Sequence, residues 1–197
     1  MTKQLVLASA SPRRKELLDQ IGVSYTVYPV DIDETPKQSE IPQDYVFRVA
    51  AEKAAVCMLT LNSPLPVLAA DTSVVIEGCI LGKPENKEHA HAMLNKLSGK
   101  WHSVYSAVSL RCRGINEETR HFQALSITEV KFRTIQPQEI QAYWETGEPL
   151  GKAGAYAIQG LASVFVESIN GSFSGVVGLP LFETAELLSK QGIKVIT

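Results

Sequence analysis

Apolar and polar positions follow strand-like and helix-like patterns by turns along this chain. The apolar run that opens the stretch "LVLASASPRRKELL" (residues 5–18) predicts a buried strand, and the leucines that follow share one face of a helix. Ser11 suits the N-cap of this helix, Pro12 suits its first position, and Gly22 ends it. The chain is therefore expected to begin with a strand, a turn of small residues and a short helix.

The same interleaving continues along the rest of the chain. Helices are predicted over residues 43–61, around 85–97, from Pro137 to Gly147, and over 180–190. Strands are predicted at "VLAAD", "SVVIEGCILGKP" with a hairpin turn at Glu77-Gly78, "WHSVYSAVSLRC", "LSITEVKFRTI" and "SVFVESI", followed by a strand after the "NG" turn and a short last strand. Long hairpins combined with strand–helix units predict an α/β fold with a mixed central sheet. Residues 1–197 contain no linker long enough to separate two domains, so a single domain is expected.

Composition limits the classes of partner. The chain has 197 residues, of which 45% are hydrophobic, and 19 basic residues nearly balance 21 acidic ones. Without an overall positive field, we expect a small anion held locally and no nucleic-acid polymer. Because no apolar run approaches the ~20 residues of a membrane span and the first residues lack a signal-peptide pattern, we expect a cytoplasmic protein with no membrane partner. The scattered cysteines Cys57, Cys79 and Cys112 are expected to be buried, reduced thiols.

Two arginines occupy the first turn of the first predicted helix, where the helix dipole disfavours cations. Arg13 and Arg14 each cost a few tenths to roughly 1 kcal/mol there. Backbone N–H groups at the helix start, small serines and two guanidinium groups together form a cradle for phosphate oxygens. On this hypothesis, replacing either arginine by alanine leaves the fold as stable or slightly more stable. The alternative is that both arginines are solvated on the helix surface.

An aspartate follows the apolar run in "VLAADTSV". Four apolar residues before Asp71 predict that it stands at the carboxyl end of a buried strand, where open α/β sheets place their ligand crevice. There it could hold a divalent cation or take a proton from water. Equally, Asp71 could cap a turn in which Thr72 and Ser73 bond to the local backbone.

Two lysines and a glutamine are further candidates. Lys53 lies in a mostly apolar helical stretch, and Lys83 lies in "LGKP", a tip bounded by glycine and proline; each is either a point charge for phosphate or merely solvated. The glycines of "KAGAYAIQG" and "NGSFSGVVGLP" allow either close approach of a ligand or tight turns. The amide of Gln159 both donates and accepts, which suits the edge of a pyrimidine ring.

Several of these stretches together resemble a known family. In this order, "LASASPRRKELL", "AEKA", "AADTSV", "LGKP", "LSGKWHSVYSAV", "KAGAYAIQG" and "GSFSGVVGLPLFE" are similar to the Maf family of nucleoside triphosphate pyrophosphatases. The chain resembles the branch that hydrolyses dTTP and UTP to the monophosphate and pyrophosphate more than the branch that acts on 7-methyl-GTP. The resemblance implies an elongated, two-lobed architecture similar to inosine triphosphatases, with a deep cleft across the sheet. It also implies a divalent cation (Mg²⁺, Mn²⁺ or Co²⁺) and a nucleoside triphosphate partner, and it is compatible with a homodimer.

The resemblance also implies roles for individual residues. Asp71 matches the proton acceptor, which acts with Lys53 and Lys83. The positions tied to base specificity are Arg13, Thr72 and Gln159. The remaining polar lining of the triphosphate site is Ser9, Arg14 and Glu34, of which Glu34 is a candidate metal ligand together with Asp71. Ala10 departs from the glycine or serine of many relatives and would be strained at a positive φ.

A rival function belongs to another class of protein. The family has been connected with septum formation, so the chain could be a nucleotide-binding regulator of cell division that catalyses nothing. A pure binder would not need a carboxylate beside the phosphates. Asp71, Lys53 and Lys83 together therefore favour an enzyme with a nucleotide house-cleaning role.

Overall fold

The computed structural model describes residues 3–114 and 118–196. Its centre is one mixed sheet of seven strands in the order β2-β1-β3-β5-β6-β7, with β4 paired to β3. The strands are β1 (Leu5–Leu7), β2 (Tyr25–Val27), β3 (Val67–Ile76), β4 (Cys79–Leu81), β5 (Trp101–Arg113), β6 (Thr119–Phe132) and β7 (Val166–Asn170). Within the described residues, β1 pairs in parallel with β2 and β3, and the other pairings are antiparallel. The predicted α/β class with a mixed sheet is confirmed.

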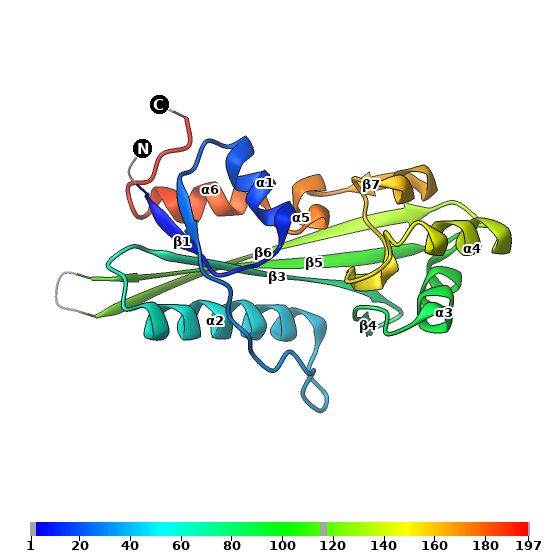
Figure 1. Ribbon diagram of the computed structural model, residues 1–197, viewed down its shortest axis with the longest axis horizontal. Helices are drawn as coiled ribbons and strands as arrows, with labels where there is room; N and C mark the ends of the chain where they lie inside the picture. Colours follow the sequence, from blue (N-terminus) through cyan, green and yellow to red (C-terminus); the bar gives the residue numbers. More distant parts are fainter. Residues whose placement is uncertain (1–2, 115–117, 197) are drawn as a thin grey trace.

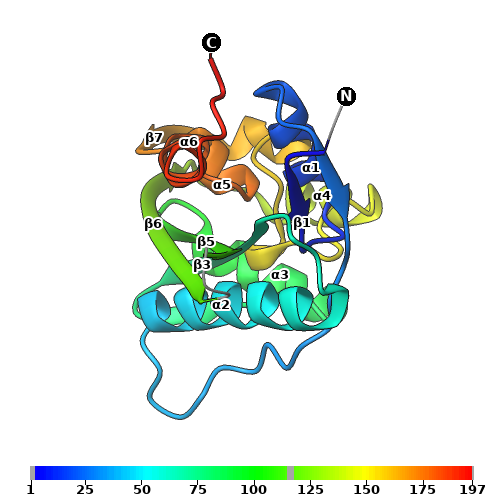
Figure 2. The same cartoon turned by 90° about the vertical axis from the view of Figure 1, so that its left-hand side faces the viewer.

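Helices cover both faces of this sheet. They are α1 (Pro12–Gln20), α2 (Pro42–Leu61), α3 (Lys87–Leu97), α4 (Pro137–Glu145), α5 (Phe173–Val177) and α6 (Leu181–Ser189), with short 3₁₀ helices η1 (Ala153–Ala155) and η2 (Leu161–Phe165). Figures 1 and 2 show α2 along one face and α1, α5 and α6 on the other, in an elongated molecule with α3 and α4 at one end. A division into two lobes stays a prediction.

Helix α2 is held to the sheet by an apolar stripe. Val46, Val49 and Ala50 are fully buried against Ala107 of β5, and each buried valine contributes on the order of 1.5–3 kcal/mol. The opposite side of α2 is open, since Leu59 is 82% exposed. This packing fixes which residues of α2 face the sheet.

A gap in the sheet lies beside the middle of β3. On one edge, β1 pairs with β3 only at Val67 and Leu68, and β4 joins the same edge only from Val74 onward. Between these points, Asp71 lies in the middle of a ten-residue strand, so the expectation that it ends the strand was wrong. The strand continues because Thr72 pairs with Ser106 of β5, and their hydroxyl oxygens lie 2.7 Å apart. The gap arises because β1 leaves the sheet.

The C-terminal region differs most from the predicted elements. The stretch after the "NG" turn is helix α5 rather than a strand, because the Ser172 side chain caps it by accepting from the Gly175 N–H at 3.0 Å. The first half of "SVFVESI" belongs to the 3₁₀ helix η2, and β7 begins only at Val166. No strand is found in residues 191–196, where a last strand was predicted. Residues 115–117 of the predicted polar loop near Gly114 lie outside the described residues.

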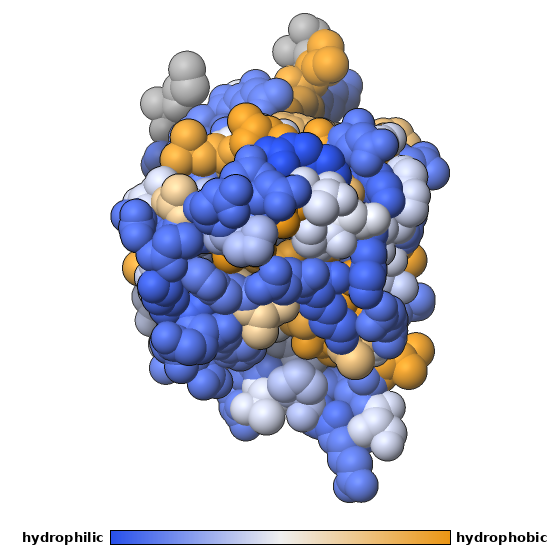
Figure 3. Space-filling view, turned by 90° about the vertical axis from the view of Figure 1, so that its right-hand side faces the viewer, coloured by the Kyte–Doolittle hydropathy of each residue, from blue (hydrophilic) through white to orange (hydrophobic). Residues whose placement is uncertain are grey.

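Other expectations concern the surface and the thiols. Cys57 and Cys112 are buried free thiols, as predicted, but Cys79 is exposed because it begins the short strand β4 at the hairpin. None of the helices in the described part of the chain has the length and hydropathy needed to cross a bilayer. Figure 3 shows the end that carries α3 and α4 as mostly hydrophilic, with apolar residues in small, separate groups. Scattered apolar residues of this kind are ordinary on a protein surface.

His102 on β5 predicts a loss of stability in mild acid. It is 2% exposed, its Nε2 atom lies 2.8 Å from the Tyr156 hydroxyl, and its Nδ1 atom is buried without a partner among the described residues. Burial lowers the pKa of His102 from 6.5 to about 4. The unfolded chain therefore binds more protons between these pH values, so the free energy of unfolding falls as the pH falls through them. From pH 7 to pH 5 we expect a loss of about 2 kcal/mol.

Urea unfolding of the wild type and of His102→Gln at pH 7 and pH 5 checks this expectation. Glutamine does not titrate, so the variant should lose less free energy of unfolding between the two pH values, even though it starts less stable. Equal losses in the two proteins would show that another group causes the acid sensitivity.

Candidate active site

The gap beside β3 opens into a cleft of about 930 Å³. Its walls come from the start of α1, the loop before α2, the hairpin β3–β4, residues 150–156 and the end of α5. Of the residues singled out in the sequence, the cleft brings together Ser9, Arg13, Arg14, Glu34, Lys53, Asp71, Thr72 and Lys83. Gln159 is not among its lining residues. Residues from elements far apart in the sequence therefore meet around Asp71.

An ion-paired cluster forms one wall of the cleft. The Lys53 Nζ atom lies 3.0 Å from Asp71 Oδ1 and 2.7 Å from Glu34 Oε1, and Lys83 Nζ lies 3.6 Å from Glu34 Oε2. Lys53 and Asp71 are 8% and 6% exposed, so both charges are buried. Lys53 faces Asp71 because it lies on the side of α2 that packs on β3. Each of the two buried charges is thus compensated by the other.

The two lysines also tune Glu34. Partial burial alone acts to raise the pKa of the Glu34 carboxyl. The hydrogen bond and charge of Lys53, supported by Lys83, together outweigh this effect, and the pKa of Glu34 is lowered. Glu34 is therefore a carboxylate at neutral pH.

Arg14 belongs to the framework of the cleft. Its Nε atom donates to the Gly178 carbonyl at 2.9 Å, and its Nη1 atom donates to Ser9 Oγ at 3.2 Å. Ser9 Oγ also accepts from the Ser11 N–H at 3.2 Å. Ser11 occupies the N-cap position but its side chain makes no capping bond, which corrects its expected role. Ala10 is not among the described residues with positive φ, so it is not strained there.

The environment of Arg13 differs from that of Arg14. Among the described residues it makes no hydrogen bond, and it lines the cleft from the first turn of α1. Burial lowers the pKa of Arg13, although Glu16 acts in the opposite sense. Burial also lowers the pKa of Arg14, where the charge of Asp71 opposes the effect and that of Arg13 adds to it. Both guanidinium groups thus lie in an environment that an added anion would improve.

The two arginines should respond differently to substitution. Arg14→Ala removes two hydrogen bonds, and we expect it to lower the free energy of unfolding by about 1–2 kcal/mol. Arg13→Ala should leave stability unchanged or slightly raised, because it only relieves the helix dipole. The expectation from sequence that both substitutions are neutral is therefore revised for Arg14. Thermal or urea unfolding of the two variants decides this; equal stabilities would show that the Arg14 bonds contribute nothing.

Sequence reasoning missed Lys152. It lines the cleft, and its only hydrogen bond among the described residues is donated to the Leu150 carbonyl at 3.1 Å. Burial lowers the pKa of Lys152, and the charge of Arg13 lowers it further. The sequence does carry a signal for it, because Lys152 opens the stretch "KAGAYAIQG", whose small residues allow close approach of a ligand. One of these, Gly154, has φ +66° and packs so closely on Val74 that a Cβ atom would lie 2.9 Å from its side chain.

Gln159 lies beside the cleft. It is exposed and lines a second, smaller hollow of about 260 Å³ with Arg13, Phe173 and other residues of α1 and α5. Arg13 and Val177 line both spaces, so the hollow adjoins the cleft. Sequence reasoning had not indicated that Gln159 would be separated from Asp71.

Long-range bonds hold the turn that carries Gln159. The Glu148 carboxylate accepts from the Leu161 and Ala162 N–H groups at 3.0 and 3.2 Å and from the Tyr143 hydroxyl at 2.8 Å. The Tyr143 oxygen in turn accepts from the Ala157 N–H at 3.2 Å. These bonds fix the turn from both sides.

The cleft offers a divalent cation two carboxylates. Across the described residues, no group of three or more histidine, cysteine or acidic side chains is arranged to hold a metal ion. Asp71 and Glu34 nevertheless converge on one ammonium group, at 3.0 and 2.7 Å. Mg²⁺ in nucleotide sites commonly binds one or two carboxylates and completes its shell with phosphate oxygens and water. Asp71 and Glu34 fit that mode of binding.

Comparison with known proteins finds one family and close relatives. A family model described as "Maf-like protein" matches residues 4–191. A protein of Methylococcus capsulatus named "dTTP/UTP pyrophosphatase" is 53% identical over 190 residues, covering 96% of this chain and 92% of that protein. A protein of the same name from Nitrosomonas europaea is 51% identical over 203 residues, covering 97% and 96% of the two chains.

Solved structures with similarity to the chain are more distant. A Ham1 protein from Staphylococcus aureus has a TM-score of 0.43 and 20% identity, with 65% of this chain and 72% of that chain covered. A HAM1 protein from Coxiella burnetii has a TM-score of 0.44 and 18% identity, with 72% and 91% covered.

Proposed function

The chain belongs to the Maf-like protein family, and on that premise we propose that its cleft hydrolyses dTTP and UTP to the nucleoside monophosphate and pyrophosphate. The observation that carries the proposal is the buried Asp71 carboxylate in a cleft whose charged lining is mostly cationic. Relatives about half identical over nearly the whole chain, named for this activity, support it. An enzyme with this activity would have a house-cleaning role in nucleotide metabolism.

The cleft has the charge that a triphosphate needs. Its lining includes five cationic side chains against the two carboxylates Glu34 and Asp71; the cations are Arg13, Arg14, Lys53, Lys83 and Lys152. The backbone N–H groups at the start of α1 add partial positive charge. A triphosphate, which is strongly anionic, would therefore be neutralised without an overall positive field on the protein.

We propose that Asp71 acts on the attacking water. Lys53 donates to Asp71 Oδ1, whereas Oδ2 makes no hydrogen bond within the described residues. In the reaction we propose, Oδ2 accepts a proton from water as the water oxygen forms a bond to the α-phosphorus. The bond from the α-phosphorus to the bridging oxygen breaks, and pyrophosphate leaves with the electron pair. Arg14, Lys83 and Lys152 stabilise the charge that develops on the leaving group.

We propose that Glu34 and Asp71 are the protein's ligands for the divalent cation, Mg²⁺, Mn²⁺ or Co²⁺. The cation would supply additional charge neutralisation for the triphosphate. Lys53 would remain beside both carboxylates and keep their oxygens oriented.

The hollow beside the cleft suits the base. Uracil and thymine present a ring N–H donor flanked by carbonyl acceptors, which the amide of Gln159 can match by accepting and donating. Arg13 lines both spaces, and Thr72 lines the cleft next to Asp71 on β3. Phe173 is 51% exposed in the hollow and offers a ring on which a pyrimidine can stack. We therefore propose Arg13, Thr72 and Gln159 as specificity residues.

Steady-state kinetics across a panel of triphosphates tests this function. We expect dTTP and UTP to be cleaved with kcat/KM values within about tenfold, because one methyl group is worth ~1 kcal/mol. ATP and GTP should be poor substrates, because their bases present a different pattern of donors and acceptors to Gln159 and leave polar groups unpaired. Gln159→Ala should reduce the preference for dTTP over GTP. Preference for GTP or 7-methyl-GTP would contradict the assignment, and tight binding without turnover would favour the regulator of septum formation.

A further inference from the structure

The loop that carries Glu34 has little apolar packing of its own. Partly buried Val30 and Ile32 pack against the core, but apolar anchoring ends there. Asp33 and the residues from 35 to 39 are exposed. On its C-terminal side, the loop that carries Glu34, which bridges Lys53 and Lys83, is therefore held by polar contacts.

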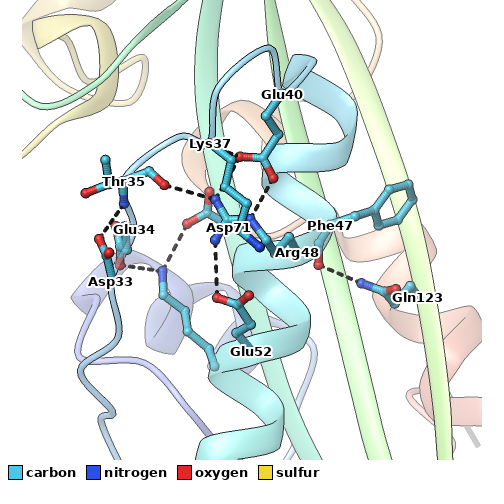
Figure 4. A network of polar contacts seen from close by, with 11 residues as sticks. Asp33, Glu34, Thr35, Lys37, Glu40, Phe47, Arg48, Glu52, Asp71 and Gln123 are labelled. Atoms are coloured by element: carbon cyan, nitrogen blue, oxygen red, sulfur yellow. Dashed lines mark hydrogen bonds and ion pairs between the residues drawn. The ribbon is translucent and has the colours of Figure 1, made fainter.

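Arg48 of α2 supplies most of these contacts (Figure 4). Its Nε and Nη2 atoms donate to the two carboxylate oxygens of Glu40 at 2.6 and 2.8 Å, and Nη2 also donates to the Thr35 carbonyl at 3.1 Å. Its Nη1 atom reaches Glu52 Oε2 at 3.2 Å. The side chains of Arg48 and Glu40 are only 14% and 9% exposed, so this two-pronged ion pair is well shielded from water.

Two further bonds continue the hold along the loop. Glu40 Oε2 accepts from the Lys37 N–H at 2.9 Å, and Asp33 Oδ1 accepts from the Thr35 N–H at 2.9 Å. The hydrogen bonds from Arg48 are the main cause of a Glu40 pKa lowered to about 2. The Arg48–Glu40 pair therefore stays charged under ordinary assay conditions.

The same helix, α2, contacts the backbone of the loop and also carries Lys53, which contacts Glu34. Thr35, whose carbonyl Arg48 binds, directly follows Glu34, and Lys53 comes five residues after Arg48 on α2. The Arg48 guanidinium also lies 5.6 Å from the ring centre of Tyr45, which lines the cleft. Arg48 itself is absent from the cleft lining. Its influence on the site must act through the loop and Tyr45.

We propose that Arg48 is a positioning residue that, together with Glu40, presets Glu34 between Lys53 and Lys83. Its effect on rate rests on the proposed pyrophosphatase function, whereas its effect on the loop does not. Loss of the pair would let Glu34 take up other positions, and displacement of a site group by about 1 Å can cost about a hundredfold in rate.

The chain offers a matched control. Arg133 forms a similar two-pronged pair with Glu139, at 2.7 and 2.9 Å, and lies 5.3 Å from the ring centre of Phe165. None of these three residues lines the cleft. Arg133→Met therefore removes the same kind of interaction as Arg48→Met, but away from Glu34.

The test combines kinetics with hydrogen exchange on the full-length chain. We expect Arg48→Met to lower kcat for dTTP by roughly tenfold to a hundredfold with KM changed less than threefold. Glu40→Gln should lower kcat to a smaller extent. Arg48→Lys should have a higher kcat than Arg48→Met, because lysine restores one charged contact. Amides of residues 35–40 should exchange faster in Arg48→Met. Arg133→Met should leave both kcat and this exchange within twofold of wild type.

Two results in Arg48→Met itself would overturn the proposal: unchanged exchange over residues 35–40, or faster exchange there with kcat within twofold of the wild type. A fall in kcat of the same size in Arg133→Met would also overturn it, since the effect would then be one of general stability. If the wild-type protein hydrolyses no triphosphate, the proposed function fails, and the exchange data alone decide whether Arg48 holds the loop.

Discussion

Asp71→Asn should lower kcat for dTTP hydrolysis about a thousandfold while leaving the protein folded and the triphosphate bound at least as tightly. The amide keeps the shape of the carboxylate and can still accept a hydrogen bond from Lys53, whose Nζ lies 3.0 Å from Oδ1. It cannot take a proton from water, a role that is worth about a hundredfold to ten-thousandfold in rate. It also removes a negative charge that repels the substrate.

The experiment compares kcat with the affinity for a non-hydrolysable α,β-methylene analogue of dTTP on the same preparation. Asp44→Asn is the control, because Asp44 is exposed in the first turn of α2 and does not line the cleft. It should keep kcat within twofold. Near-native turnover in Asp71→Asn would remove Asp71 from the chemistry.

Lys53→Met should both destabilise the fold and abolish most activity. The ammonium group lies between Asp71 and Glu34 and is nearly inaccessible to water, with Lys53 8% exposed. Its removal leaves the buried Asp71 charge without its partner, which typically costs 3–5 kcal/mol. We expect a loss of about 3 kcal/mol in the free energy of unfolding and at least a hundredfold fall in kcat.

Lys83→Met is the matched comparison for this prediction. The Lys83 side chain is 64% exposed and 3.6 Å from Glu34, so its loss should change stability by less than about 1 kcal/mol. Urea unfolding measures both variants. The double variant Lys53→Met with Asp71→Asn should be more stable than the sum of the two single losses implies, because it leaves no unpaired charge. Equal stabilities of the Lys53 and Lys83 variants would contradict the buried-pair account.

Local patterns were sufficient where neighbouring residues decide the structure. The stretch 43–61 predicted helix α2, which begins one residue earlier at Pro42, and Glu77-Gly78 predicted the hairpin, where both residues have positive φ. Asp71 was placed wrongly because the length of β3 depends on its pairing with β5, which no local pattern records. Helix α5 was mistaken for a strand because its residues suit either state, and the cap from Ser172 decides between them.

The candidate site shows the same division. Asp71 and Arg14 stood out in the sequence because their residue types are unusual for their positions, whereas the role of Lys53 came from the resemblance to the Maf family. The separation of Gln159 from Asp71 could not be predicted from sequence, since the turn that carries Gln159 is fixed by Glu148 and Tyr143 through contacts made only in the fold. The contacts of Arg48 with the Glu34 loop could not be predicted either, because in the sequence Arg48 looks like any solvent-exposed charged residue on a helix.

Hydrolysis of dTTP in ¹⁸O-labelled water tests the central claim most directly, because it reports which phosphorus the water attacks. Mass spectrometry of the products should find the label in dTMP and none in pyrophosphate, with no orthophosphate released. This result follows from attack on the α-phosphorus by water that Asp71 deprotonates. Label in pyrophosphate, or release of orthophosphate with dTDP, would place the attack elsewhere on the triphosphate and contradict the account.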